Sequence, residues 1–213
     1  MTEQTQRTQR SAATVRGTVA AAVAVLGLAS CGGGGNPLDN PASIQNPTLS
    51  GNQKLAFAYF QRCVFPVFLA QLPIQFANGT TAINTCAASG CHDNTNGTGG
   101  AFRVIGNAQP IDLTNPANTA DIIKASDMYK NFYSAQGEVV FGNPLGSRIL
   151  AKPMVNGVLH GGGLVFANAQ DPNARLIQYW INNPAASGTD EFNNTTFRMF
   201  TPADPNTGAC NTQ

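Results

Sequence analysis

Two cysteines five positions apart, followed directly by a histidine, constrain this chain more than any other feature of its sequence. They are Cys86, Cys91 and His92 in "CAASGCH", and the chain has only two histidines. A disulfide has no use for the histidine, and a tetrahedral zinc site rarely takes two adjacent ligands. Covalent haem attachment uses this order, because two cysteines bond to the vinyl groups and the next histidine binds the iron. The sequence therefore predicts one covalent haem c, held by Cys86 and Cys91, with His92 as the proximal iron ligand.

The spacing departs from the common C-x2-C-H pattern, because four residues separate Cys86 from Cys91. This C-x4-C-H spacing is a rarer variant among c-type cytochromes, and the maturation machinery is less permissive towards it. A Cys86–Cys91 disulfide, a zinc site and a chance occurrence remain alternatives from the residues alone.

Residues 1–30 are predicted to be a lipoprotein signal peptide. Three arginines precede the apolar run "TVAAAVAVLGLAS", which is shorter than the ~20 apolar residues of a transmembrane helix. The run ends in "LASC", which resembles the lipobox of bacterial lipoproteins and implies lipidation of Cys31; an ordinary signal peptide is the alternative. Residues 31–50, rich in glycine and proline, are expected to be a flexible tether. The protein is thus expected to be lipid-anchored in the bacterial cell envelope, at the outer membrane, facing the periplasm or the surface.

The charge balance argues against nucleic-acid binding. Removing residues 1–30 takes away three arginines and one glutamate, which leaves 9 basic against 10 acidic residues and a formal net charge of −1. Nothing in this composition offers the basic stripe that neutralises phosphates.

Two cysteines, Cys63 and Cys210, are left after the motif and the lipid anchor are assigned. In an oxidising periplasm they are expected to form a disulfide, which would close a very long loop and stabilise the fold by up to ~5 kcal/mol. Two free buried thiols are the alternative.

Residues 51–213 are expected to form a single domain that is mainly α with long loops. The last helix is the clearest, because Asp171 suits its N-cap, Pro172 its first position, and Trp180 lies on its apolar face. Apolar spacing and breakers predict further helices from Asn52 to about Cys63, with Pro66 as a kink or end, from about Thr119 to Ser134, and in a short segment closed by Pro153. Residues 73–117 are expected to be loop with short extended pieces around "AFRVI".

Two blocks of sequence resemble small extracytoplasmic cytochrome c domains. The first is "VFPVF…C…CH…GTGGAFRV…IDL", and the second is "GSRILAKPMVNGVLHGGGLVFANAQDPNARLIQYWI". The resemblance covers about residues 52–184 and implies a cytochrome c-like domain. It also implies Phe102, Leu164 and Phe166 as walls of the haem pocket.

The resemblance places the histidine of the family's "HGGG" block on His160, which is therefore expected to be the distal iron ligand. Three glycines beside it would let the backbone approach the haem face. Met154 is the main alternative ligand, and Met128 or an open sixth position are others. Arg148 and Lys152 are candidates for pairing with the haem propionates.

These features together predict a membrane-anchored monohaem c-type cytochrome that transfers single electrons to and from redox partner proteins, and not an enzyme. A sensor or peroxidase-like activity stays open if His160 is off the iron. The alternative of another class is a haem-free, disulfide-stapled surface lipoprotein that binds a partner.

Overall fold

A helix of almost entirely apolar residues, from Phe57 to Leu69, lies at the centre of the fold. In this computed structural model, which describes residues 53–213, the helix consists of α1 (Phe57–Tyr59), the π-helical turn η1 (Phe60–Val64) and α2 (Phe65–Leu69). The wide turn comes just before Pro66, which has no N–H to donate, and the amide of Phe65 reaches back to the carbonyl of Phe60. The helix therefore continues through Pro66 instead of ending there. It begins at Phe57, later than expected.

The predicted signal peptide, the lipidation site Cys31 and the tether lie outside the described residues. The other elements are β1 (Leu72–Gln75), β2 (Thr81–Asn84), α3 (Ala120–Ala125), α4 (Asp127–Gln136), α5 (Arg148–Ala151), α6 (Pro172–Asn182), the 3-10 turn η2 (Asn194–Met199), β3 (Phe200–Thr201) and β4 (Ala209–Cys210). Helices thus carry most of the regular structure and long loops join them, in agreement with a mainly α prediction.

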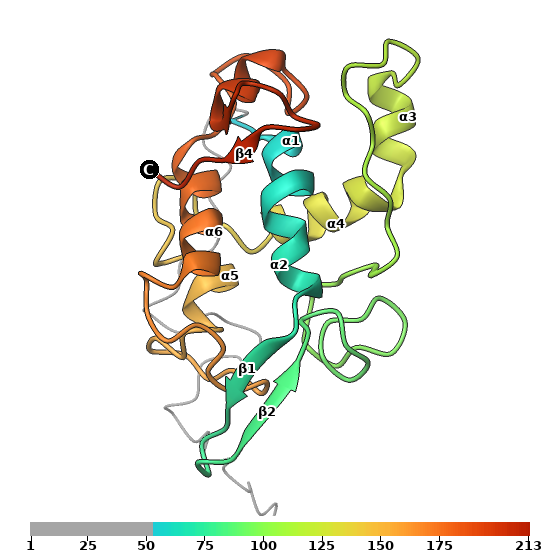
Figure 1. Cartoon of the computed structure of the whole chain (residues 1–213). Coiled ribbons are helices and arrows are strands. Elements are labelled where there is room, and N and C mark those ends of the chain that lie inside the picture. The colour runs from blue at the N-terminus through green and yellow to red at the C-terminus, as the bar shows by residue number, and fades with distance from the viewer. Residues whose placement is uncertain (1–52) are drawn as a thin grey trace, which may run out of the picture. The chain divides into compact units, whose positions relative to one another are not determined.

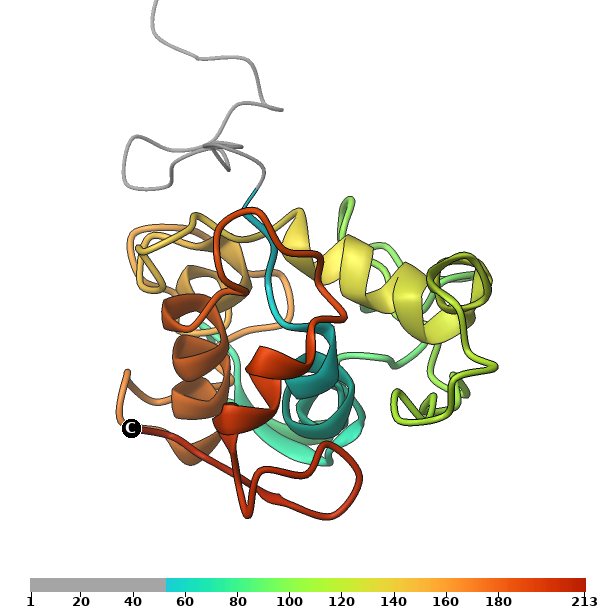
Figure 2. The same ribbon diagram turned by 90° about the horizontal axis from the view of Figure 1, so that it is seen from above.

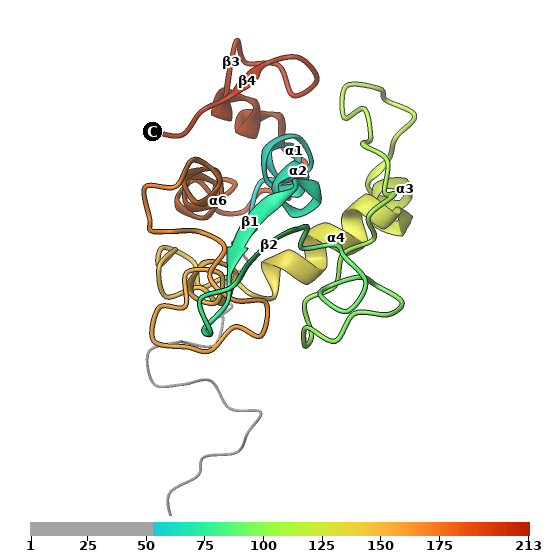
Figure 3. The ribbon, with the colours of Figure 1, turned by 60° about the horizontal axis from the view of Figure 1, so that its bottom comes forward.

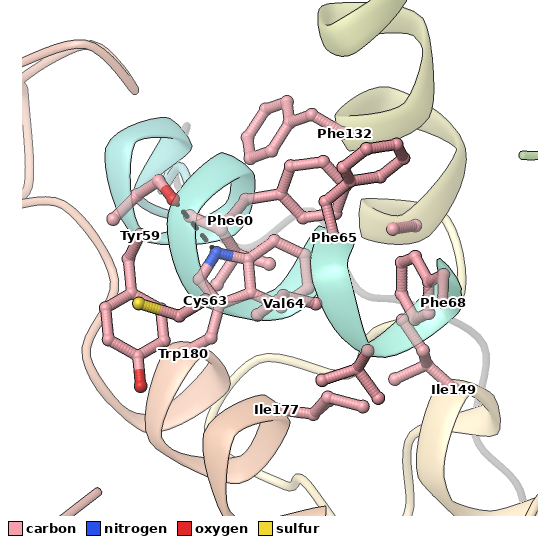
Figure 4. Packing of buried hydrophobic residues seen from close by; sticks show 14 of the residues in the cluster. Tyr59, Phe60, Cys63, Val64, Phe65, Phe68, Phe132, Ile149, Ile177 and Trp180 are labelled. Atoms are coloured by element: carbon pink, nitrogen blue, oxygen red, sulfur yellow. Dashed lines mark hydrogen bonds between the residues drawn. The ribbon is translucent and has the colours of Figure 1, made fainter. Parts of the chain in front are cut away.

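The last helix, α6, packs beside the first, as Figures 1 and 2 show. The side chain of Asp171 accepts hydrogen bonds from the amides of Asn173 and Ala174, so the predicted N-cap is confirmed. Trp180 is fully buried between the helices, 5.4 Å from the ring of Phe60, and its indole N–H donates to the carbonyl of Ala56 (Figure 4). Burial of such a ring makes it a principal source of core stability.

The segment predicted as one helix from about Thr119 to Ser134 is two helices, α3 and α4, that meet at Ser126. This residue has an extended backbone, and its hydroxyl accepts the amide of Tyr129, so it is the N-cap of α4. α4 inserts Phe132 into the core, 5.5 Å from the ring of Phe60.

A β-hairpin formed by β1 and β2 occupies part of the segment expected to be loop. Figure 1 shows β1 continuing from the lower end of α2, and in Figure 3 the hairpin lies in front of that helix. The strands pair antiparallel from Leu72 opposite Asn84 to Gln75 opposite Thr81, and the turn contains Gly79 at a positive φ of 84°. An Asn-Gly pair, Asn78–Gly79, is a known hairpin signal, so the sequence contained a sign of this element.

Cys63 and Cys210 form the predicted disulfide, which joins η1 to β4 across 147 positions of sequence. The central helix is thereby linked to the C-terminal end of the chain. Within the described residues, no helix has the length and apolar character needed to cross a membrane.

Candidate functional site

The cysteine–histidine motif begins directly after β2, in a tight loop. The amide of His92 donates to the carbonyl of Cys86 at 3.0 Å, and the amide of Cys91 donates to Ala88 at 3.0 Å. Gly90 has a positive φ of 82°, which a side-chain-bearing residue rarely adopts. The loop thus brings the two ends of the motif together.

His92 is held in place from both its backbone and its ring. Its carbonyl accepts the amide of Val104 at 2.7 Å, and its ring nitrogen Nδ1 lies 3.1 Å from the carbonyl of Phe102. The ring of Phe102 also packs against the imidazole, with centroids 4.7 Å apart. Gly99 lies so close to the imidazole that a Cβ there would come within 2.6 Å of Nδ1. Gly99, the first of the glycine pair after the motif, therefore makes room for the histidine ring.

His160 is held in a similar way on the hairpin side of the fold. Its Nδ1 lies 2.7 Å from the carbonyl of Gly163, and the next residue, Leu164, exchanges two backbone hydrogen bonds with Gln75 of β1. The hairpin therefore fixes the position of the loop that carries His160.

The three glycines after His160 have different surroundings. A Cβ on Gly163 would lie 2.6 Å from the carbonyl oxygen of Gln75, and its φ is +76°. A Cβ on Gly162 would lie 3.0 Å from Cε1 of His160, whereas nothing lies within 4 Å of one on Gly161. Glycine is therefore required at position 163 because the backbone there lies close to strand β1. The sequence analysis had expected the glycines to allow a close approach to the haem face instead.

The two histidines come together although they are 68 positions apart in sequence. Their ring centroids are 6.3 Å apart and their planes are inclined by only 13°. A bond from a metal to an imidazole nitrogen is about 2 Å long, so two rings on opposite sides of one ion have centres roughly 6 Å apart. The observed separation fits this arrangement.

The hydrogen bonds of both rings also suit metal binding. A backbone carbonyl can only accept, so the Nδ1 atom of each ring that bonds to one carries the proton. This leaves each Nε2 with a free lone pair, which is the form in which histidine binds a metal, and the carbonyl partner fixes the ring's orientation.

Both histidines are biased towards the neutral state. Burial lowers the pKa of His92 below its usual 6.5; the Phe102 carbonyl opposes this shift, and the positive charges of His160, Arg103 and Lys152 add to it. Burial likewise lowers the pKa of His160, with the Gly163 carbonyl opposing and Lys152 adding to the shift. Neutral imidazoles are what an iron site requires.

Cys86 and Cys91 are both partly buried free thiols. Burial, with a smaller contribution from the neighbouring Cys91, raises the pKa of Cys86 to about 11. The amide group of Asn84 lies 3.9 Å from the sulfur of Cys91. The structure does not join Cys86 to Cys91 by a disulfide.

The other residues singled out from the sequence have varied surroundings. Met154 and Phe102 pack against the core cluster, and Phe166 is buried in it. Arg148, one of the two candidates for pairing with the haem propionates, forms an ion pair with Glu138 at 2.8 Å. Lys152 is near enough to both histidines to influence their pKa values. Met128 is fully buried on α4.

Among the described residues, no three His, Cys, Asp or Glu side chains are grouped so as to hold a metal ion. A haem site needs fewer protein ligands than such a metal site, because the porphyrin supplies four of the iron's nitrogen ligands and the protein supplies the axial ones. No family model, curated protein or solved structure matches the chain.

Proposed function

We propose that the protein is a monohaem c-type cytochrome, with a cytochrome c-like fold, that carries single electrons in the cell envelope. The observation that carries the proposal is the pair of parallel imidazoles, His92 and His160, whose centroids are 6.3 Å apart beside two free cysteines. In this proposal Cys86 and Cys91 would hold the haem covalently, and His92 and His160 would both be ligands of its iron.

When bound, the haem supplies a one-electron iron couple. The chain's own residues bind and orient it. Carbonyls of Phe102 and Gly163 hold each of the two rings in one tautomer and one orientation. Histidine at both axial positions favours a lower potential than a Met/His pair.

If His92 and His160 both hold the haem iron, the chain would leave no position on it for a substrate. The proposed role is therefore that of an electron carrier serving redox partner proteins, and not that of a peroxidase. The proposed membrane attachment rests on the sequence around Cys31, with the tether of residues 31–50 leaving the domain free to reach its partners.

The test is the haem content of the mature protein, produced together with the cytochrome c maturation proteins. After denaturation in alkaline pyridine, the visible spectrum should show one covalent haem per chain, and mass spectrometry should find it on the peptide containing Cys86 and Cys91. Replacing both by serine should abolish attachment. Replacing Cys63 and Cys210 by serine, the matched control, should not. A chain without haem, with Cys86 and Cys91 oxidised to each other, would instead support the stapled lipoprotein.

A further inference from the structure

A surface pocket of about 550 Å³ lies over α4. It is formed where the end of α3, the exposed face of α4 and the start of α5 meet residue 101. The side chains that give it its chemistry are Lys124, Lys130, Arg148, Glu138, Tyr129 and Tyr133.

The charges lining the pocket are mostly positive. Arg148 and Glu138 pair with each other at 2.8 Å, so they largely cancel. Lys130 contacts Asp127 at 2.7 Å, but both side chains are more than half exposed, and such a pair is weak in water. Lys124, whose ammonium lies 5.8 Å from the ring centre of Phe192, is the third cation. The pocket therefore favours a ligand with negative charge.

The pocket also offers aromatic surface. Tyr129 and Tyr133 are four residues apart on α4 and so lie on the same face of the helix. Tyr133 is 68% exposed, an unusual position for a large aromatic side chain. The hydroxyl of Tyr129 donates to the buried carboxylate of Glu191 at 2.7 Å, which fixes its ring. A flat ligand can stack on such rings while the lysines hold its charge.

One wall of the pocket is shared with the support of His92. Ala101 lines the pocket and directly precedes Phe102, whose carbonyl bonds the ring of His92. The hydroxyl of Ser134, which also lines the pocket, accepts the amide of Arg103 at 2.7 Å. A molecule in the pocket would thus contact the segment that holds the proximal histidine.

We propose that this pocket binds a small, flat aromatic molecule that carries negative charge. This binding does not require haem, so it stands apart from the function proposed above. If that function also holds, the ligand lies next to the segment whose Phe102 carbonyl holds the proposed iron ligand His92.

The test uses two flavins that share one ring system, riboflavin 5′-phosphate and riboflavin, titrated against the mature protein and followed by flavin fluorescence. At low salt, riboflavin 5′-phosphate should bind saturably and at least about fivefold more tightly than riboflavin. Added salt should remove this difference in affinity. Replacing Lys124 and Lys130 together by glutamine should weaken binding of the phosphate form about tenfold. Lys54→Gln, a change outside the pocket, should leave it unaltered.

The aromatic contribution is tested separately. Tyr133→Ser should weaken both flavins by about the same factor of three to ten, because the stacking surface serves the ring and not the phosphate. The proposal is overturned if the two flavins bind equally at low salt, if neither binds, or if Lys54→Gln weakens binding as much as the double change. Repeating the titration on haem-free protein separates this result from haem attachment.

Discussion

The most informative single substitution is Gly163→Ala, because this glycine joins the His160 loop to strand β1. The new Cβ would lie 2.6 Å from the carbonyl oxygen of Gln75, and the residue would keep a φ of +76°. The left-handed backbone costs an alanine about 1–2 kcal/mol, and relieving a contact with a backbone atom adds about 1–3 kcal/mol. Part of this cost is offset, because an alanine leaves the unfolded chain with less conformational entropy than a glycine does. We expect the free energy of unfolding to fall by about 2–4 kcal/mol.

The same motif supplies the control. Gly161→Ala introduces a Cβ with nothing within 4 Å, so its unfolding free energy should stay within about 0.5 kcal/mol of the parent. Urea unfolding followed by tryptophan fluorescence measures both, since the single Trp180 is in the core. Equal stability of the two variants would refute the reasoning, because it would mean that the loop does not need to lie against β1.

The remaining predictions concern the disulfide, the free thiol and a helix cap. Replacing Cys63 and Cys210 by serine should lower the unfolding free energy by about 3–5 kcal/mol. A reductant should destabilise the parent protein but not this variant. A parent protein whose stability does not change with reductant would argue against the disulfide. In haem-free protein Cys86, with its pKa raised to about 11, should be a protonated thiol at neutral pH. The rate of its alkylation, measured by peptide mass spectrometry, should therefore rise about tenfold per pH unit until about pH 11. Fast alkylation at neutral pH would contradict the raised pKa. Asp171→Ala should cost about 1 kcal/mol in urea unfolding while Asp171→Asn, which keeps a cap oxygen, should cost much less; equal losses would exclude the cap as the cause.

Local signals in the sequence predicted the features that depend on neighbouring residues. The N-cap Asp171 and the proline after it located the start of α6, and the cysteine count predicted the bridge between Cys63 and Cys210. The hairpin of β1 and β2 was missed although its turn contains an Asn-Gly pair, because the surrounding glycine- and threonine-rich sequence resembles loop.

Other features depend on contacts between segments that are distant in sequence, and no local sequence pattern predicts them. The π-helical turn before Pro66 exists because the apolar faces on both sides of it pack into one core, so the proline does not end the helix. The requirement for glycine at Gly163 arises from its contact with Gln75, which is far away in sequence. The histidine pair was expected from the resemblance, but the separation and angle of its rings depend on the whole fold.

The most direct test of the central claim is the spin state of the ferric iron in haem-loaded protein and in its His160→Gly variant. We predict a low-spin parent, a high-spin variant, and a return to low spin when imidazole is added to occupy the space left by the ring. Met154→Leu should remain low spin. A His160→Gly variant that stays low spin without imidazole, together with a Met154→Leu variant that becomes high spin, would contradict iron binding by His92 and His160.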